Sequence, residues 1–284
     1  MDVINLIIYI AIALSGTVFG SFFTLAVHRI PKGQDITHER SYCPNCNHKL
    51  NFLDLIPVWS YIFLGAKCRY CKQKIRPRYL ILEICSGLVF VLLALSHKIN
   101  FESTMHDYIL FAFDVLFLCC IFITAGIDKE TKKIPDSVMI YGTIIALFKT
   151  IYNVCSLKSQ FTDRVVVIDE VFFFLEQWVL CMVIPAILIL VDYICAKLLK
   201  KNELEIGLDD IKYLMVLGLY FLSFYQMLGF ILSTSIILIY LIVYVIINFV
   251  KSKKNKQLNL LPKEIPLGFF MSIAYTIVML LVSF

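Results

Sequence analysis

Regular alternation of polar and apolar residues is scarce in this sequence. A soluble domain of this length would show alternation with a period of 2 or 3.6 residues and a smaller apolar share. Here the apolar residues come in long runs, and 60% of the 284 residues are hydrophobic, with a mean hydropathy of +0.83. An ordinary soluble domain is therefore excluded, and the composition predicts an all-α integral membrane protein.

Other features are missing as well, and each absence excludes a class. No basic stripe stands alone, because the lysines flank apolar runs, so the net charge of +5 does not point to nucleic acid. No glycine-rich nucleotide loop follows a predicted strand, which argues against a Rossmann-like fold. The first apolar run carries Asp2 and has its positive charges after it, so it does not resemble a cleavable signal. No internal repeat stands out.

Long apolar runs are what the sequence has in abundance. A spanning helix needs about 20 mostly apolar residues. The candidate spans are residues 3–27, 79–97, 108–127, 136–154, 171–197, 210–223, 227–250 and 265–283. The sequence therefore predicts about eight transmembrane helices. The sixth is short, and a tight turn held by Gly229 and residues 223–226 would join it to the seventh.

Positive charge is unevenly divided between the predicted loops. With eight spans in alternation, loops 28–78, 128–135, 198–209 and 251–264 lie on one side of the membrane. These loops and their flanks hold 22 of the 26 lysines and arginines. The positive-inside rule predicts that they are cytoplasmic and that both termini lie outside.

The only sizeable polar segment is the first of these loops. We therefore divide the chain into a first transmembrane helix (1–27), a cytoplasmic loop (28–78) and a transmembrane core (79–284). Six of the ten cysteines lie in or beside apolar runs, where a thiol usually behaves as a small hydrophobe.

The other four cysteines form two CxxC pairs within the loop, CPNC and CRYC. Cys43, Cys46, Cys68 and Cys71 can surround one tetrahedral Zn²⁺. All four ligands would come from protein, so the zinc would be structural, a staple for a small zinc-ribbon-like loop that is too short to build much of a core. Unligated cysteines and a redox CxxC are the alternatives, whereas structural disulfides are not expected in a reducing compartment.

Acidic residues at the membrane boundary need an explanation, because charge in or beside a span is costly. Asp128 lies at the C-terminal end of the third span, where the helix dipole disfavours an anion, so capping does not explain it. Asp136 follows a proline at a helix start, where capping explains it well. Asp209 and Asp210 also stand at a helix start, and capping is a good explanation for that pair taken alone.

Topology places Asp128 and Asp210 at the same boundary although they are 82 residues apart. Two carboxyls brought together in a low-dielectric site cannot both ionise easily, so one acts as acid while the other activates water. That is the chemistry of an aspartic protease and needs no metal. Asp114 and Asp192 would be the first candidates for an ion or proton pathway, and Glu83 could pair with an arginine at the boundary.

Five segments in order resemble the type IV prepilin peptidase family. They are GSFFTLAVHRIP (20–31), SYCPNCNHKLNFLDLIPVWSYIFLGAKCRYCKQKIRPRYLILE (41–83), DKETKKIPD (128–136), GLDDIKYL (207–214) and IPLGFF (265–270). The resemblance runs over nearly the whole chain. Each segment is weak alone, but five in register are specific.

The resemblance implies a GxGD-type membrane-embedded aspartic protease. It would remove the short basic leader of type IV prepilins or pseudopilins at the cytoplasmic face of the bacterial inner membrane, and then methylate the new N-terminus with S-adenosylmethionine. By position in the motifs, Asp128 and Asp210 would be the catalytic pair. Components of a pilus or of a type II secretion assembly are further expected partners.

The motifs also imply supporting roles. Lys212 would tune Asp210 or steer the substrate, Gly207 would let the scissile peptide approach, and Glu83 would lie near the methyltransferase site. Asp209 replaces the second motif glycine and adds a negative neighbour to Asp210. A register shift of one residue would make Asp209 catalytic instead.

A second departure lies before the third cysteine, where the family has a glycine and this chain has Ala66. This departure bears on the methyltransferase activity more than on the protease.

Three other functions are compatible with the residues. A related intramembrane aspartic protease without methylation is the first, although such relatives generally lack the zinc loop. The second is a non-enzymatic membrane protein with a zinc-ribbon docking module. The third is a transporter, which would depend on Asp114 or Asp192.

Overall fold

A computed structural model describes most of the chain, and the described part is helical. The described residues are 3–160, 172–173, 175–180, 182–183, 185–190, 207–252 and 266–282. Within them the only β-type pairings are two isolated antiparallel bridges, both in the loop after the first helix. The predicted all-α fold is therefore confirmed.

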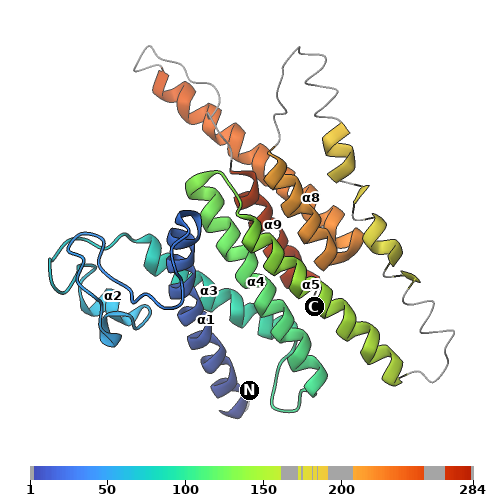
Figure 1. Cartoon of the computed structure of the whole chain (residues 1–284), viewed down its shortest axis with the longest axis horizontal. Coiled ribbons are helices and arrows are strands. Elements are labelled where there is room, and N and C mark those ends of the chain that lie inside the picture. Colours follow the sequence, from blue (N-terminus) through green and yellow to red (C-terminus); the bar gives the residue numbers. More distant parts are fainter. Residues whose placement is uncertain are drawn as a thin grey trace. The chain divides into compact units, whose positions relative to one another are not determined.

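A long loop follows the first helix, and short connections join α3 to α4 and α4 to α5 (Figure 1). They are α1 (Val3–Arg29), η1 (Ile30–Lys32), η2 (Phe52–Asp54), α2 (Trp59–Phe63), α3 (Arg78–Ser96), α4 (Met105–Thr131), α5 (Asp136–Gln160), α8 (Leu208–Ser252) and α9 (Leu267–Val282).

Among the described residues, four helices are long and apolar enough to cross a membrane: α1 with η1, α3, α4 and α5. They correspond to the first four predicted spans. The helix α9 corresponds to the last one, but its apolar stretch is shorter. The structure describes the predicted span 171–197 only in pieces, between residues 172 and 190. The count of eight spans therefore stays a prediction.

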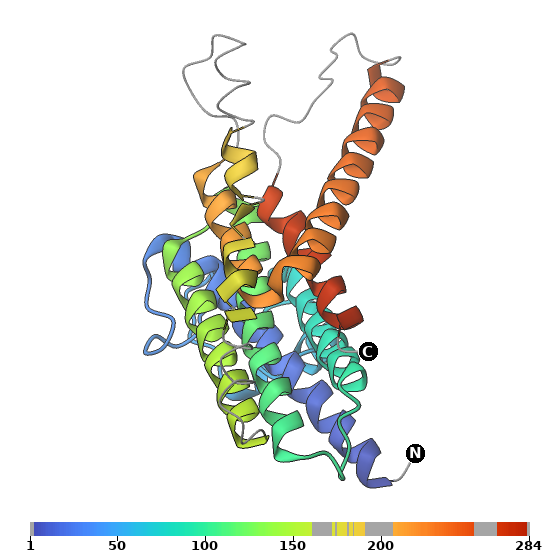
Figure 2. The ribbon, with the colours of Figure 1, turned by 90° about the vertical axis from the view of Figure 1, so that its right-hand side faces the viewer.

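The helix α8 folds back on itself. Asp210 lies near the amide of Gly268, and the ring of Tyr240 lies 5.1 Å from the ring of Phe270. These two residues of α8 are 30 positions apart, which is about 45 Å along a straight helix, yet both meet the first turn of α9. The helix must therefore bend sharply, and its two arms are visible in Figure 2. The arms match the predicted spans 210–223 and 227–250.

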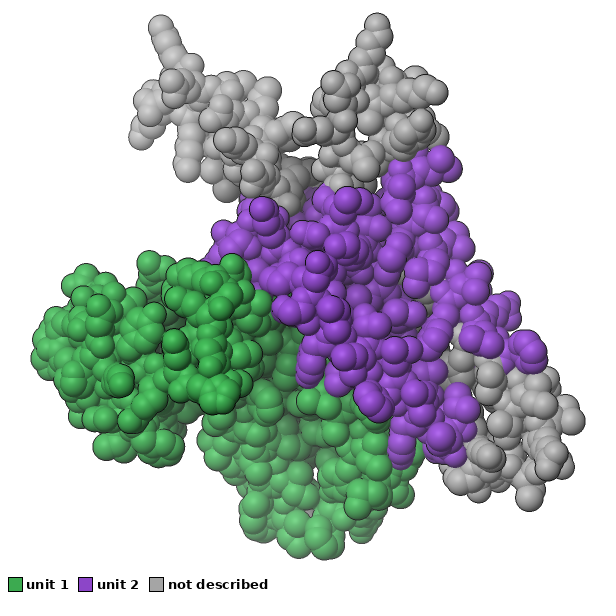
Figure 3. All heavy atoms as spheres, viewed as in Figure 1, with its two compact units in different colours: residues 1–126, 283–284 green, residues 127–282 purple. Residues whose placement is uncertain are grey.

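The chain forms two compact units, coloured separately in Figure 3. The first comprises residues 1–126 with 283–284, and the second comprises residues 127–282. The boundary lies within α4. The division predicted from the sequence (1–27, 28–78 and 79–284) follows membrane topology instead, and it stays a prediction.

Small residues bring α1 and α3 together in the first unit. A Cβ on Gly16 would lie 2.8 Å from the Cα of Gly87, so the two backbones are in direct contact. The hydroxyl of Ser86 donates a hydrogen bond to the carbonyl of Gly16 across this contact, at 2.7 Å. Close approach at small residues, with a polar side chain as a link, is how membrane helices associate without a hydrophobic driving force.

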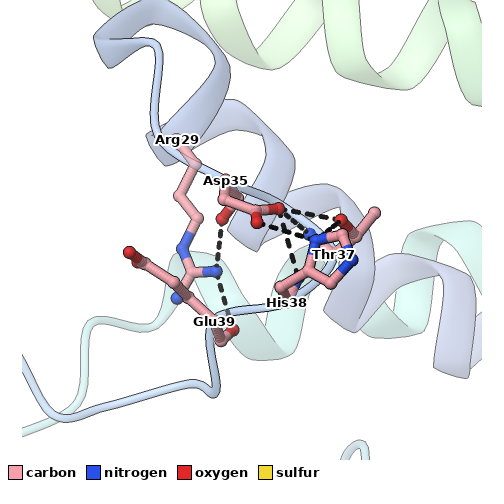
Figure 4. Close-up of polar contacts among 5 residues, drawn as sticks. All are labelled: Arg29, Asp35, Thr37, His38 and Glu39. Atoms are coloured by element: carbon pink, nitrogen blue, oxygen red, sulfur yellow. Dashed lines mark hydrogen bonds and ion pairs between the residues drawn. The ribbon is translucent and has the colours of Figure 1, made fainter.

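Arg29 ends α1 and organises the start of the long loop (Figure 4). Its guanidinium is buried and donates hydrogen bonds to the backbone carbonyls of Asp35, Glu39 and Arg40, at 2.7, 2.9 and 3.2 Å. The loop therefore wraps around a cation at the end of a spanning helix.

Candidate functional site

Asp128 lies in the last turn of α4 and is buried, with 3% of its surface exposed. Its Oδ2 accepts a hydrogen bond from the backbone amide of Phe269, at 2.9 Å. Phe269 belongs to the first turn of α9. The C-terminal end of one helix, which disfavours an anion, is thus compensated by the N-terminal end of another, which favours one.

Asp210 lies in the first turn of α8 and is positioned by Gly207. The carbonyl of Gly207 accepts the amides of Asp210 and Ile211, so Gly207 holds the N-cap position. A Cβ on Gly207 would lie 2.9 Å from Oδ2 of Asp210. The glycine therefore makes room for the Asp210 carboxyl itself. From the sequence we expected it to make room for the scissile peptide of the substrate.

The two acids share one end of α9. The backbone amide of Gly268 lies close enough to both carboxyls to act on their charge, and the charge of Asp128 acts on Asp210. A Cβ on Gly268 would lie 3.2 Å from Oδ2 of Asp128. The segment IPLGFF is one of the five that resemble the family, but no site residue was predicted in it. Its only signal was the glycine next to a helix start.

One oxygen of this pair has no protein partner. Among the described residues, Oδ1 of Asp210 is buried without a hydrogen bond. A buried carboxyl oxygen normally has a partner, and an exception points to a bound water, a ligand or a catalytic role. Oδ1 of Asp210 is therefore available to accept a hydrogen bond from a bound water or ligand.

Lys212 contacts the neighbours of Asp210. Its Nζ donates to Oδ1 of Asp136 at 2.9 Å and lies 3.8 Å from Oδ1 of Asp209. All three side chains are largely exposed, so these pairs contribute little to stability. Gly207 already occupies the N-cap, so Asp209 is not needed there. The helix dipole favours its negative charge in the first turn of α8, and Lys212 pairs with it.

The two rival acids have different outcomes. Asp114 is buried in α4, and its Oδ2 pairs with Nε2 of His97 at 2.7 Å. A polar partner for a buried acid accounts for Asp114 as a link between α3 and α4. Asp192 lies outside the described residues.

The four loop cysteines come together as the CxxC pattern predicts. Their sulfurs all lie within 4.8 Å of one another, and those of Cys43 and Cys71 are 3.9 Å apart. Ligands at the usual Zn–S distance of about 2.3 Å in a tetrahedron would be about 3.8 Å apart. Burial raises the pKa of the Cys68 thiol, but hydrogen bonds from the amides of Cys71 and Tyr70 outweigh it and lower that pKa to about 7. The pKa of Cys71 moves the other way, to about 11: the Gln73 amide lowers it, but burial and the other three thiols raise it more. Of these two thiols, Cys68 is therefore the one biased toward the thiolate that binds metal.

The two cysteine pairs are copies of one short motif, CPNCNHKL and CRYCKQKI, and this corrects the expectation that the chain has no internal repeat. In each copy the residue after the second cysteine has a positive φ, at Asn47 and Lys72. The first cysteine accepts that residue's amide, and an isolated bridge closes each copy. Two such knuckles facing each other give the tetrahedral set.

Ala66 also has a positive φ, of 57°. Its amide bonds to the carbonyl of Tyr61 and ends α2, and its carbonyl accepts the amide of Ile75. This backbone conformation favours glycine. The glycine that the resembling family carries here therefore has a conformational reason, and alanine is strained at this position.

Glu83 is buried in the second turn of α3, where it joins the loop to α1 and α3. Its Oε2 accepts a hydrogen bond from the amide of Val58 at 2.7 Å, and the Ser21 side chain of α1 lies close enough to act on its charge. These partners account for its burial without the arginine pair left open by the sequence.

Two protein-family models match this chain. The Bacterial Peptidase A24 N-terminal domain matches residues 14–97, and the Type IV leader peptidase family matches residues 115–243. The first match contains the cysteine loop and Glu83, and the second contains Asp128 and Asp210. No solved structure matches the chain.

Three similar proteins carry the name prepilin leader peptidase/N-methyltransferase. That of Klebsiella pneumoniae is 33% identical over 129 residues, covering 43% of this chain and 53% of the relative. That of Vibrio cholerae is 34% identical over 92 residues, with 30% and 35% covered. That of Bacillus subtilis is 31% identical over 126 residues, with 44% and 48% covered.

The matched part of the chain spans about half the length of these relatives or less. The two family matches nevertheless follow each other along most of the sequence, in the same order as the motifs of the cysteine loop and the two aspartates. The chain belongs to the type IV leader peptidase family.

Proposed function

We propose that this chain is a membrane-embedded aspartic endopeptidase that removes the short basic leader of type IV prepilins or pseudopilins. The observation that carries the proposal is the buried pair of Asp128 and Asp210, which lie at the N-terminal end of α9. Oδ1 of Asp210 has no hydrogen-bond partner within the part of the chain that the structure describes. The names of the relatives support the substrate class.

The chemistry follows from the pair. One carboxylate takes a proton from a water molecule, whose oxygen attacks the scissile carbonyl carbon, while the other carboxyl donates its proton to the carbonyl oxygen. The tetrahedral intermediate then breaks its C–N bond, and the leaving amine takes up a proton from the pair. Because the two acids act as a unit, neither is expected to work alone.

Location and substrate fit the same scheme. The uneven division of lysine and arginine supports a cytoplasmic position for the loops that carry Asp128 and Asp210. The apolar helix of a prepilin would lie among the spanning helices, and its basic leader would meet the acidic end of the site.

The cysteine loop supports the bifunctional form of the enzyme. The cysteine set fits a structural zinc, which when bound would hold the two knuckles together. S-adenosylmethionine is the proposed methyl donor. The carboxyl of Glu83 already accepts a hydrogen bond from the Val58 amide and lies beside the Ser21 side chain. We therefore propose that Glu83 supports the loop, and we give it no step in methyl transfer.

Co-expression with a prepilin tests the proposal. A mobility shift of leader length should appear with the wild-type chain and vanish with Asp128→Asn and with Asp210→Asn. The adjacent Asp209→Asn variant is the matched control, and it should still cleave. If either catalytic variant processes prepilin at the wild-type rate, the pair is wrongly assigned, and if only Asp209→Asn fails, the motif register is shifted by one.

Mass spectrometry of the mature pilin in the same experiment addresses the second activity. A methylated N-terminus supports the bifunctional enzyme, whereas cleaved but unmethylated pilin favours the protease-only alternative.

A further inference from the structure

The long loop displays large apolar side chains that no part of its own fold covers. Phe52 is 80% exposed, Trp59 56% and Phe63 79%, and Leu53 and Ile62 are exposed beside them. We call these five residues the apolar foot. The rings of Trp59 and Phe63 stack with centroids 5.8 Å apart. A soluble surface rarely exposes such a set together, so the foot marks an interaction surface.

The foot surrounds a shallow depression of about 460 Å³. Leu53, Trp59 and Phe63 line it together with Ile56 and Leu64, and Ser60 and Arg69 complete the lining. The lining is almost entirely apolar, which suits hydrocarbon and not a polar ligand.

The position of the foot is fixed against a spanning helix. The amide of Val58, the residue before α2, donates to Oε2 of Glu83 at 2.7 Å. Glu83 lies five residues into α3 from Arg78, which is about 7.5 Å along the helix axis. In Figure 1 the loop accordingly folds back alongside α1 and does not extend beyond its end.

This attachment is made at a strained backbone position. Val58 has a φ of 63° and a ψ of −53°, and the Trp59 amide bonds to the Pro57 carbonyl across it, at 2.6 Å. A β-branched residue adopts this tight turn only when its surroundings impose it. The turn fixes the direction in which α2 leaves the Val58–Glu83 contact.

Positive charge lies at the same boundary. Lys32 lies 2.8 Å from His28 through Nζ and Nε2, and Arg76 and Arg78 lie close enough to act on the charge of His28. These residues end α1 and precede or begin α3, so both ends of the loop carry cations where the spanning helices leave the membrane. Such clusters favour anionic lipid headgroups.

We propose that the apolar foot inserts into the boundary between headgroups and acyl chains of the leaflet that faces the loop, and that this leaflet is anionic. Val58, the residue before α2, is attached about 7.5 Å along α3 from Arg78, a length comparable to the depth of about 5–10 Å at which interfacial apolar faces are buried. Tryptophan and phenylalanine are suited to this layer. Lipid is favoured over a protein partner because both ends of the loop continue into spanning helices, which hold the foot at the bilayer in every state of the enzyme. The proposal is independent of the peptidase chemistry.

Fluorescence of the full-length protein in vesicles tests the insertion. The chain has two tryptophans, so Trp178→Phe leaves Trp59 as the only one. In vesicles of phosphatidylcholine and phosphatidylglycerol, lipid brominated near the headgroup should quench Trp59 most, lipid brominated near the chain end less, and aqueous iodide least. The same quenching should weaken in phosphatidylcholine alone.

Three outcomes would overturn the proposal. Quenching by iodide and not by brominated lipid would place the foot in water. Resistance to both quenchers would mean that protein covers it. Protection that appears only after a prepilin is added would make the foot a docking site for the substrate.

A protease experiment does not depend on the tryptophan variant. Phe63→Ser should increase cleavage within loop 28–78 of the reconstituted protein, because a polar residue weakens insertion. Phe101 is also largely exposed but lies between α3 and α4, so Phe101→Ser is the matched control and should not change that cleavage. An unchanged cleavage rate in Phe63→Ser would contradict the insertion.

Discussion

Gly207 and Gly268 carry no side chains, yet they set the positions of the two buried carboxyls. The carbonyl of Gly207 accepts a hydrogen bond from the Asp210 amide at the N-cap of α8, and the amide of Gly268 acts on the charge of both acids. The first turn of α8 and the first turn of α9 can approach the acids only because these positions lack a Cβ.

We expect Gly207→Ala and Gly268→Ala to reduce prepilin cleavage. A Cβ would stand 2.9 Å from Oδ2 of Asp210 in the first variant, and 2.8 Å from Cδ1 of Ile134 and 3.2 Å from Oδ2 of Asp128 in the second. A displacement of about 1 Å in a catalytic group reduces the rate by roughly 100-fold. Initial cleavage rates of purified variants would measure the effect.

Leu208→Ala is the control for this prediction, since Leu208 lies in the same turn of α8 and is exposed. It should cleave at close to the wild-type rate. Equal activity in all three variants would mean that the glycines do not position the acids.

We expect Ala66→Gly to stabilise the cysteine loop by about 1 kcal/mol, because the φ of 57° is unfavourable for alanine and costs glycine nothing. The measurement is the rate of zinc release to a chelator, which should fall. Ala11→Gly lies within α1, where glycine weakens a helix, so it should give no such gain. Faster zinc release in Ala66→Gly would rule out strain at this position.

At the scale of whole elements, the fold of α8 decides whether the second unit can form its site. Asp210 is at the start of one arm and Tyr240 is in the other, and both contact the first residues of α9. Near the bend, the backbone of Gly229 lies against the ring of the buried Tyr275 in α9. The bend and α9 therefore pack as one body.

We expect Gly229→Val to destabilise the protein by about 1–3 kcal/mol, because overpacking displaces a ring that has no room to move. The Cβ would lie 2.6 Å from Cε1 of Tyr275. Thermal unfolding in detergent would measure the loss. Ile231→Val, at an exposed position two residues away, should leave the unfolding temperature nearly unchanged. A stable Gly229→Val variant would contradict the packing of the bend on α9.

At the scale of the whole molecule, the distribution of charge predicts the orientation in the membrane. Alkaline phosphatase folds only outside the cytoplasm, because it needs disulfides. A fusion after Glu102, in the connection between α3 and α4, should therefore be active, and a fusion after Lys133, between α4 and α5, should be inactive. The opposite pattern would reverse the predicted topology and put the aspartate pair outside.

Much of the fold was predictable from single segments. The first four spans, the helix at the C-terminal end and the grouping of four cysteines each depend on residues close together in the sequence, through hydropathy or CxxC spacing. The resemblance of ordered motifs identified the family. The repeat of the two knuckles was also present in the sequence, but its similarity is visible mainly in the shared turn at Asn47 and Lys72.

The sequence by itself determined the membrane class, the four cysteines of the candidate metal site and the two candidate acids, because hydropathy, spacing and motif order are local properties of the chain. Only the tertiary structure decided what these residues meet. It brought the end of α9 to Asp128 and Asp210, gave Lys212 to Asp136 and Asp209, and attached the loop to Glu83. These contacts join residues up to 141 positions apart, and they depend on how helices pack, which no local pattern encodes.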